Sequence, residues 1–169
     1  HSGEKSPDTI IALNHLAAFL LTTELLPLLR ASRSARIINI ASHAHLNYDI
    51  DFKNLTTRSN YDGKVAYGRS KLANILFTHE LARKMEGSRM SVNAISPGNV
   101  LTNFSSNNGR WSWAKHVGAH LLARNLISAK KAATALCHVA LSPETEGVSG
   151  SYFVGRTPTR SSEPSYRLD

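Results

Sequence analysis

Blocks of apolar and polar residues along the chain predict an alternation of helices and strands. Residues 10–30 are predicted to form a helix whose first half is apolar on nearly every side, which is typical of a helix buried within a protein. Residues 67–85 follow the 3.6-residue period of a helix and stop at Gly87. A further helix is predicted from about residue 129 to 141, with Ser128 as its amino-terminal cap.

Three short apolar runs predict strands at residues 36–41, 91–95 and 150–154. Their brevity and near-continuous hydrophobicity fit buried strands of a parallel sheet. Between the second and third strands the pattern is weaker and suggests one helix from 111 to 122. The tail, residues 156–169, is polar and is expected to be loose.

This alternation predicts an α/β domain with a parallel sheet and flanking helices. Three strands make a thin sheet, and one of its edges would leave backbone groups unpaired beside apolar side chains. Residues 1–169 are therefore expected to form part of a larger single domain, and a first residue His1 in place of Met fits a fragment. The exposed edge predicts self-association or pairing with a partner strand.

Composition describes one soluble globular domain: of 169 residues 41% are hydrophobic, and 20 Lys and Arg against 12 Asp and Glu give a net charge of +8. The basic residues are scattered with no run longer than two, which argues against a nucleic-acid partner. The lone Cys137 is expected to be a small core residue and favours a reducing compartment. The longest unbroken apolar stretch, residues 16–21, is far shorter than the ~20 residues of a membrane span.

The segment Tyr67-Gly-Arg-Ser-Lys71 is the strongest candidate for catalysis. Residues four apart on a helix lie one above the other on the same face. A neighbouring ammonium lowers the pKa of a phenol, which is otherwise near 10, so that a tyrosine can exchange protons with an alcohol or carbonyl oxygen. A surface Tyr and Lys on a solvated helix is the alternative interpretation of this motif alone.

Two strand ends add to this candidate. Ser42 follows the strand at 36–41, and the breaker pair Pro97-Gly98 follows the strand at 91–95. The carboxyl ends of parallel strands are where ligands bind in open α/β sheets, and glycine lets the backbone approach a flat ligand closely. A hydroxyl at Ser42 could donate to the same substrate oxygen as the phenol, although a serine at a strand end is also a common turn former.

From about Asn14 to Val154 the sequence resembles the short-chain dehydrogenase/reductases, and within them the retinol-dehydrogenase-like branch that includes the WW-domain-containing oxidoreductase. The resemblance rests on five segments: Asn14-His-Leu with Phe19-Leu-Leu-Thr22, Arg36-Ile-Ile-Asn-Ile-Ala-Ser42-His-Ala-His45, Tyr67 with Ser70-Lys71-Leu-Ala-Asn74, Pro97-Gly98, and Glu146-Gly147 with Gly150 and Tyr152-Phe153. Together they imply a Rossmann-type parallel sheet and a nucleotide-dependent oxidoreductase.

The resemblance implies a role for each matching residue. Tyr67 would donate or accept the proton, Lys71 would tune the phenol and bind the nicotinamide ribose, and Ser42 would orient the substrate oxygen. Asn14 would hold a water that relays protons through Lys71. The stretch that packs against the nicotinamide would comprise Pro97, Gly98, Val100 and Thr102, and the hydride would come from the cofactor.

The chain departs from the family pattern in one important respect. None of its ten glycines forms the G-x-x-x-G-x-G or G-x-G-x-x-G phosphate turn, so the amino-terminal strands and the dinucleotide cradle would precede residue 1. The choice between NADP and NAD is made in that part, with the resemblance favouring NADP. Ala17 and Ala18 replace the Gly-His of the branch, and Ser96 replaces the His of its His-Pro-Gly.

Other candidates carry less weight. His43 and His45 have no carboxylate or cysteine at a metal-ligand spacing, so no metal site is predicted. The family covers its substrate with the region that here contains Phe104, Trp111 and Trp113, which would form a partly apolar lid; a helix packed on the sheet is the alternative.

The sequence therefore predicts an oxidoreductase that interconverts an alcohol and a carbonyl, acting on a hydrophobic substrate such as a retinoid, steroid or other lipid. Its expected location is the cytosol or the cytosolic face of an intracellular membrane. A catalytically silent fragment or interaction module derived from such an enzyme is the alternative, because the dinucleotide cradle is missing.

Overall fold

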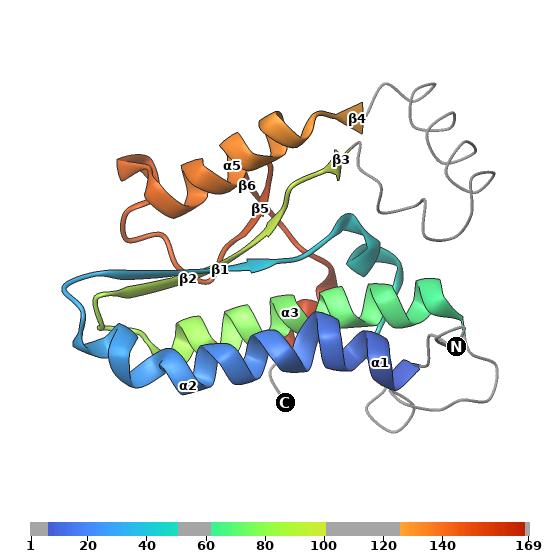
Figure 1. The fold of residues 1–169 in the computed structure, drawn as a ribbon, viewed down its shortest axis with the longest axis horizontal. Helices are drawn as coiled ribbons and strands as arrows, with labels where there is room; N and C mark the ends of the chain where they lie inside the picture. The colour runs from blue at the N-terminus through green and yellow to red at the C-terminus, as the bar shows by residue number, and fades with distance from the viewer. Residues whose placement is uncertain (1–6, 51–61, 101–125, 168–169) are drawn as a thin grey trace, which may run out of the picture.

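The computed structural model describes residues 7–50, 62–100 and 126–167. It has a layer of helices on each face of a mixed sheet (Figure 1). The sheet order is β1-β2-β5-β6, and the strands are β1 (Ala35–Ile40), β2 (Met90–Ser96), β5 (Tyr152–Val154) and β6 (Thr157–Thr159). The first three run parallel and β6 returns antiparallel to β5. The predicted α/β class is confirmed, whereas the antiparallel fourth strand was not predicted.

One face of the sheet is covered by two long helices that lie side by side (Figure 1). The first is continuous from α1 (Pro7–Ile11) through the π-helical η1 (Ala12–Leu16) to α2 (Ala17–Ala31), and the second is α3 (Gly63–Lys84). The opposite face carries α5 (Ala129–Leu141). The short elements are η2 (His43–Asn47), β3 (Asn99–Val100), β4 (Leu126–Ile127), η5 (Pro143–Thr145) and η6 (Glu163–Tyr166), with β3 and β4 paired in parallel.

The core lies on both faces of β2, which is buried along its whole length. On one face Val92 packs with Leu81 of α3 and with Met85, which directly follows that helix, and on the other Ile95 packs with Val139 of α5 and with Phe153. Burying an aliphatic or aromatic side chain of this size contributes about 1.5–3 kcal/mol. This two-sided burial explains why apolar residues of the strand, such as Val92 and Ile95, point to both faces of the sheet.

The first helix differs from the prediction in its burial. None of the side chains in α2 is buried, and leucines such as Leu13, Leu20 and Leu28 are largely exposed, while Leu26 and Leu29 pack against the core. By length and composition this helix, Thr9–Ala31 with a mean hydropathy of 1.5, could cross a membrane, contrary to the sequence-based expectation. Polar residues such as Asn14 and Glu24 interrupt the apolar sequence of the helix, so its longest unbroken apolar run is short although its mean hydropathy is high.

The other boundaries are close to the predicted ones, with two exceptions. The helix containing Tyr67 begins at Gly63, because the Asp62 side chain accepts a hydrogen bond from the Lys64 amide and caps it. The expected loose tail is instead structured from β6 to Arg167. Its Ser165 is fully buried and donates to the Ser162 carbonyl.

Two further details concern single residues. The helix from 129 to 141 is confirmed, with the Ser128 hydroxyl accepting from the Lys131 amide. Cys137 on that helix is exposed, so its assignment to the core was wrong. Helix α5 packs through Ala135 and Val139, and Cys137 points away from that side.

Gly68 allows α3 to approach the segment that follows β1. A Cβ at this position would overlap the ring of Tyr48 and lie 3.0 Å from the Ala44 carbonyl oxygen. The absence of a side chain therefore sets the separation between α3 and η2, which begins directly after Ser42.

Replacing Gly68 with leucine should lower the free energy of unfolding by roughly 1–3 kcal/mol, because the added side chain overpacks this contact. Chemical denaturation measures the change. Ala73→Leu on the same helix is the matched control, since Ala73 borders an open groove. Equal stability of the two variants would contradict the close approach.

Candidate functional site

Tyr67 and Lys71 lie on adjacent turns of α3 at the carboxyl end of β1. The Lys71 Nζ atom is 5.6 Å from the centroid of the Tyr67 ring. It also donates a hydrogen bond of 3.1 Å to the carbonyl oxygen of Ile40, the last residue of β1. The predicted i, i+4 pair is therefore a spatial pair, and the strand end fixes its ammonium group.

The surroundings of Lys71 change its proton affinity. Burial lowers the pKa of its ammonium group from the ordinary lysine value of 10.5, since a charge loses hydration there. Its acceptor, the Ile40 carbonyl, carries no net charge. Among the described residues no carboxylate forms an ion pair with this ammonium group. A cation held in this way is available to stabilise negative charge on a neighbouring group.

Asn14 lies in the π turn of the first helix and contacts α3 at Ser70, between Tyr67 and Lys71. Its Nδ2 donates to the Ser70 hydroxyl at 3.2 Å, and that hydroxyl donates to the Tyr67 carbonyl at 2.7 Å. The π turn makes i→i+5 hydrogen bonds such as Ala17 to Ala12, a local irregularity that often marks functional positions.

Ser42 is half-buried and caps η2, where its hydroxyl oxygen accepts a hydrogen bond of 3.3 Å from the Ala44 amide. Its carbonyl is held by His45, whose Nδ1 is 2.6 Å away. Because Nε2 of His45 accepts from the Ser162 amide, Nδ1 must carry the proton and donate to Ser42. Burial lowers the pKa of His45, which keeps this side chain neutral as a brace for the segment.

The carboxyl ends of β1 and β2 meet as predicted. The Ser96 hydroxyl at the end of β2 is 2.9 Å from Nδ1 of His43. Gly98 follows with a φ of 98°, a conformation that favours glycine, and it is flanked by the half-buried Pro97 and Val100. The two histidines considered as metal ligands thus have protein partners at this strand end.

The lid and one cofactor-binding residue lie outside the described residues. These are Thr102, Phe104, Trp111 and Trp113. The candidate catalytic residues are all described and lie on three elements: the π turn with Asn14, the segment after β1 with Ser42, and α3 with Tyr67 and Lys71. The described cofactor-binding candidates Pro97, Gly98 and Val100 follow β2.

Two polar residues in this region were not assigned a role from the sequence. Asn74 is 4% exposed and hydrogen-bonds to the main chain of both Asn14 and Ile40, and His45 is fully buried. A polar residue at a buried helix position was the available signal for Asn74, since it lies three residues after Lys71 on the same side of α3. No comparable signal marks His45, whose partner is 117 residues away.

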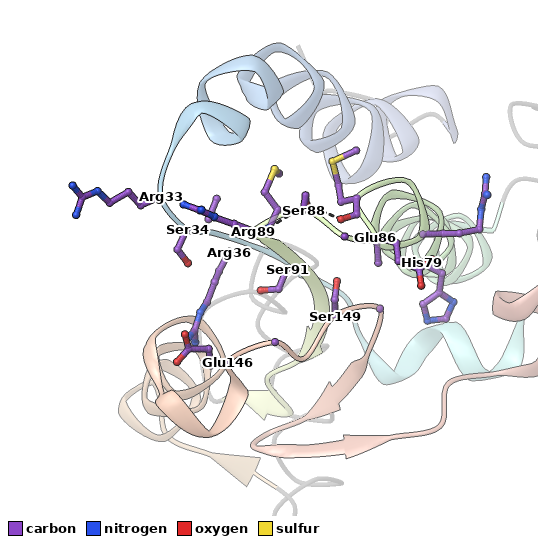
Figure 2. A pocket seen from close by; sticks show the side chains of 18 of the residues that line it. Arg33, Ser34, Arg36, His79, Glu86, Ser88, Arg89, Ser91, Glu146 and Ser149 are labelled. Atoms are coloured by element: carbon purple, nitrogen blue, oxygen red, sulfur yellow. Dashed lines mark hydrogen bonds between the residues drawn. The ribbon is translucent and has the colours of Figure 1, made fainter.

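A cavity of about 780 Å³ lies at the opposite, amino-terminal end of β1 and β2. Figure 2 shows its arginine and serine side chains, among them Arg36 and Arg89, and none of the predicted site residues lines it. Arg36 is occupied by hydrogen bonds to the Ser142 carbonyl and the Thr145 hydroxyl.

Comparison with known proteins points to one family. A family model described as short chain dehydrogenase matches residues 2–113. Retinol dehydrogenase 14 from Homo sapiens is 41% identical over 150 residues, which cover 83% of this chain and 42% of that protein. Retinol dehydrogenase 13 from Mus musculus is 39% identical over 155 residues, covering 85% and 44%. The chain thus spans less than half the length of these relatives.

Solved structures with the same fold include a 4-hydroxyisoleucine dehydrogenase mutant complexed with NADH and succinate. The TM-score is 0.67 at 22% identity, over 93% of this chain and 61% of that one. A protein from Mycobacterium paratuberculosis, described as uncharacterized, matches with a TM-score of 0.63 at 27% identity, over 94% and 52%. The arrangement of helices and sheet is therefore that of short-chain dehydrogenases.

The buried ammonium of Lys71 should make stability depend on alkaline pH. Its pKa is lower in the folded than in the unfolded state, so the unfolded state binds more protons and the stability of the protein rises as the pH approaches 10.5. Denaturation at several pH values should show a steeper rise for the wild type than for Lys71→Met. Lys64→Met, at the exposed start of α3, should keep the wild-type slope. Identical slopes for wild type and Lys71→Met would contradict this burial.

Proposed function

The chain belongs to the short-chain dehydrogenase family, and we propose that it carries the catalytic part of an NAD(P)-dependent oxidoreductase that interconverts an alcohol and a carbonyl. The observation that carries the proposal is the Lys71 ammonium, 5.6 Å from the Tyr67 ring and tied to the end of β1. The chain spans 42% of the human relative, so the activity proposed here is that of a protein that includes the remaining family segments.

The described residues fit the nicotinamide end of such a cofactor. Lys71 offers a donor for ribose hydroxyls, and Gly98 lies beside the half-buried Pro97 with no side chain of its own to separate a ligand from the backbone. Val100, also half-buried, follows two residues later. Thr102 belongs to the same proposed binding stretch. When bound, the cofactor supplies or accepts the hydride. The choice between NADP and NAD remains with the dinucleotide cradle, for which this chain has no glycine-rich turn.

In the proposed mechanism the side chains of the site handle the proton. The Tyr67 hydroxyl donates a proton to the carbonyl oxygen during reduction, and its phenolate form accepts the proton from the alcohol during oxidation. Lys71 stabilises the negative charge left on the phenolic oxygen, and the Ser42 hydroxyl donates a hydrogen bond to the same substrate oxygen. Asn14 would bind the water that passes protons on through Lys71.

The names of the relatives, retinol dehydrogenases, support a proposal for the substrate class. We propose a retinoid-like or other hydrophobic alcohol or aldehyde, with Phe104, Trp111 and Trp113 as its cover. No nucleic-acid partner is proposed, and the protein would act in the cytosol or on the cytosolic face of an intracellular membrane. The long apolar helix near the amino terminus is compatible with the second location.

The second candidate is a catalytically silent module. It is favoured by two observations: the missing glycine-rich turn and the outer edge of β1, which pairs with no strand among the described residues. Such an edge offers unpaired backbone groups to a strand of another chain or of a second copy. Under this alternative the residues of the site would be remnants of an active ancestor.

Tyr67→Phe in the natural polypeptide should lower kcat by at least about 10²-fold while leaving cofactor affinity unchanged, because it removes only the hydroxyl that moves the proton. Steady-state kinetics with all-trans-retinol and a cofactor titration measure the two effects. Tyr166→Phe is the control, since its hydroxyl accepts only from the Ser161 amide in the carboxyl-terminal segment. Full turnover by Tyr67→Phe at neutral pH would rule out the proposed mechanism.

For the 169 residues alone we expect NADPH and NADH to bind more weakly than about 1 mM, because a dinucleotide gains much of its affinity at a glycine-rich phosphate turn. Cofactor fluorescence during titration measures this. Micromolar affinity in the isolated chain would show that the cradle is not needed and would favour an enzyme that functions as it stands.

A further inference from the structure

The side-chain amide of Asn74 makes three hydrogen bonds. Its Nδ2 donates to the main-chain carbonyl of Asn14 at 3.0 Å and to that of Ile40 at 3.2 Å. Its Oδ1 is 2.9 Å from Nδ1 of His15. With 4% of its surface exposed, the residue has little access to water that could replace these partners.

These contacts fix the orientation of the amide without ambiguity. Two carbonyl oxygens can be approached only by the NH₂ group, because the amide oxygen would repel them. Oδ1 therefore faces His15, and Nδ1 of His15 must carry the proton that it donates. The Asn74 amide, with its hydrogen bonds to Asn14, His15 and Ile40, is therefore held in one orientation. We call this group of contacts the junction.

These three hydrogen bonds connect the three elements that carry the candidate catalytic residues. Asn14 and His15 belong to the π turn, Ile40 ends β1 two residues before Ser42, and Asn74 itself is one turn beyond Lys71 on α3. Moreover, the Ile40 carbonyl accepts from both Asn74 and Lys71. Moving Asn74 would shift the acceptor that holds the Lys71 ammonium near the Tyr67 ring.

We propose that Asn74 is a positioning residue, whose amide sets the relative placement of Asn14, Lys71 and the strand end before Ser42. This inference rests on the proposed function, because it concerns the same site. Asn74 acts through these groups and does not itself touch the reacting atoms. A displacement of about 1 Å in such an arrangement can reduce turnover by about 10²-fold.

The test compares two buried asparagines in the natural polypeptide. Asn74→Leu removes the junction, and Asn93→Leu is the matched control. Asn93 is 1% exposed and has two main-chain contacts of its own, to the Val148 carbonyl and the Ser151 amide. Both variants should melt at a lower temperature than the wild type. Only Asn74→Leu should lose kcat, by about 10- to 100-fold with little change in KM, at a temperature where both are folded.

A second measurement does not depend on turnover. NMR of ¹³C-labelled lysine, with the Lys71 signal assigned by its loss in Lys71→Arg, gives the pKa of that ammonium group. Opening the junction admits water, so in Asn74→Leu the pKa of Lys71 should rise towards the ordinary value of 10.5, and in Asn93→Leu it should stay at the wild-type value. A milder variant, His15→Phe, keeps both carbonyl contacts and should give a smaller change in the same direction.

The outcomes separate the two proposals. Inactive wild type with a shifted Lys71 pKa in Asn74→Leu would overturn the proposed oxidoreductase and retain the junction. Active wild type, with unchanged kcat and Lys71 pKa in Asn74→Leu, would overturn the positioning role. Equal effects in Asn93→Leu would also overturn it, since they would arise from lost stability alone. If Asn74→Leu does not fold, unchanged values in His15→Phe would decide against the junction.

Discussion

The carbonyl oxygen of Ile40 accepts hydrogen bonds from both the Lys71 ammonium and the Asn74 amide. A carbonyl has two lone pairs, and here both are used by one helix. The end of β1 is therefore bound to α3 at two points, one turn apart. Ser42 follows within two residues, and the π turn with Asn14 is attached through the same asparagine. The described residues of the proposed catalytic group are thus connected, directly or through Asn74, to the Ile40 carbonyl oxygen.

Helix α3 has two roles that use different parts of its length. Its carboxyl-terminal turns supply Leu81 and Ala82 to the core against β2, and its amino-terminal turns carry Tyr67 and Lys71. Gly68 lets those amino-terminal turns approach η2, and Asp62 caps the start. The core therefore holds the carboxyl-terminal half of α3 in place, and the amino-terminal half carries the polar groups of the site. A site on a well-packed helix is positioned more precisely than one on a loop.

The sequence predicts the features that repeat locally and misses those that depend on distant partners. The strand at 91–95 and the helix at 129–141 follow from periodicity and capping, and the Tyr67–Lys71 pair follows from the pitch of a helix. The exposure of the first helix could not be predicted, because an apolar sequence does not show whether other helices or strands pack against it. The order in the tail arises from contacts such as that of the Ser162 amide with His45, and β6 arises from its pairing with β5; neither leaves a period in the sequence. The π turn is a local irregularity without a period of its own.

His45 connects the segment after β1 with the carboxyl-terminal tail, because it donates to the Ser42 carbonyl and accepts from the Ser162 amide. A proton added to Nε2 would remove that acceptor and place a charge in a fully buried position. Burial lowers the pKa of His45, so the unfolded state takes up this proton more readily and mild acid acts against the folded state here. Mild acid therefore weakens the contact between the carboxyl-terminal tail and the segment that carries Ser42.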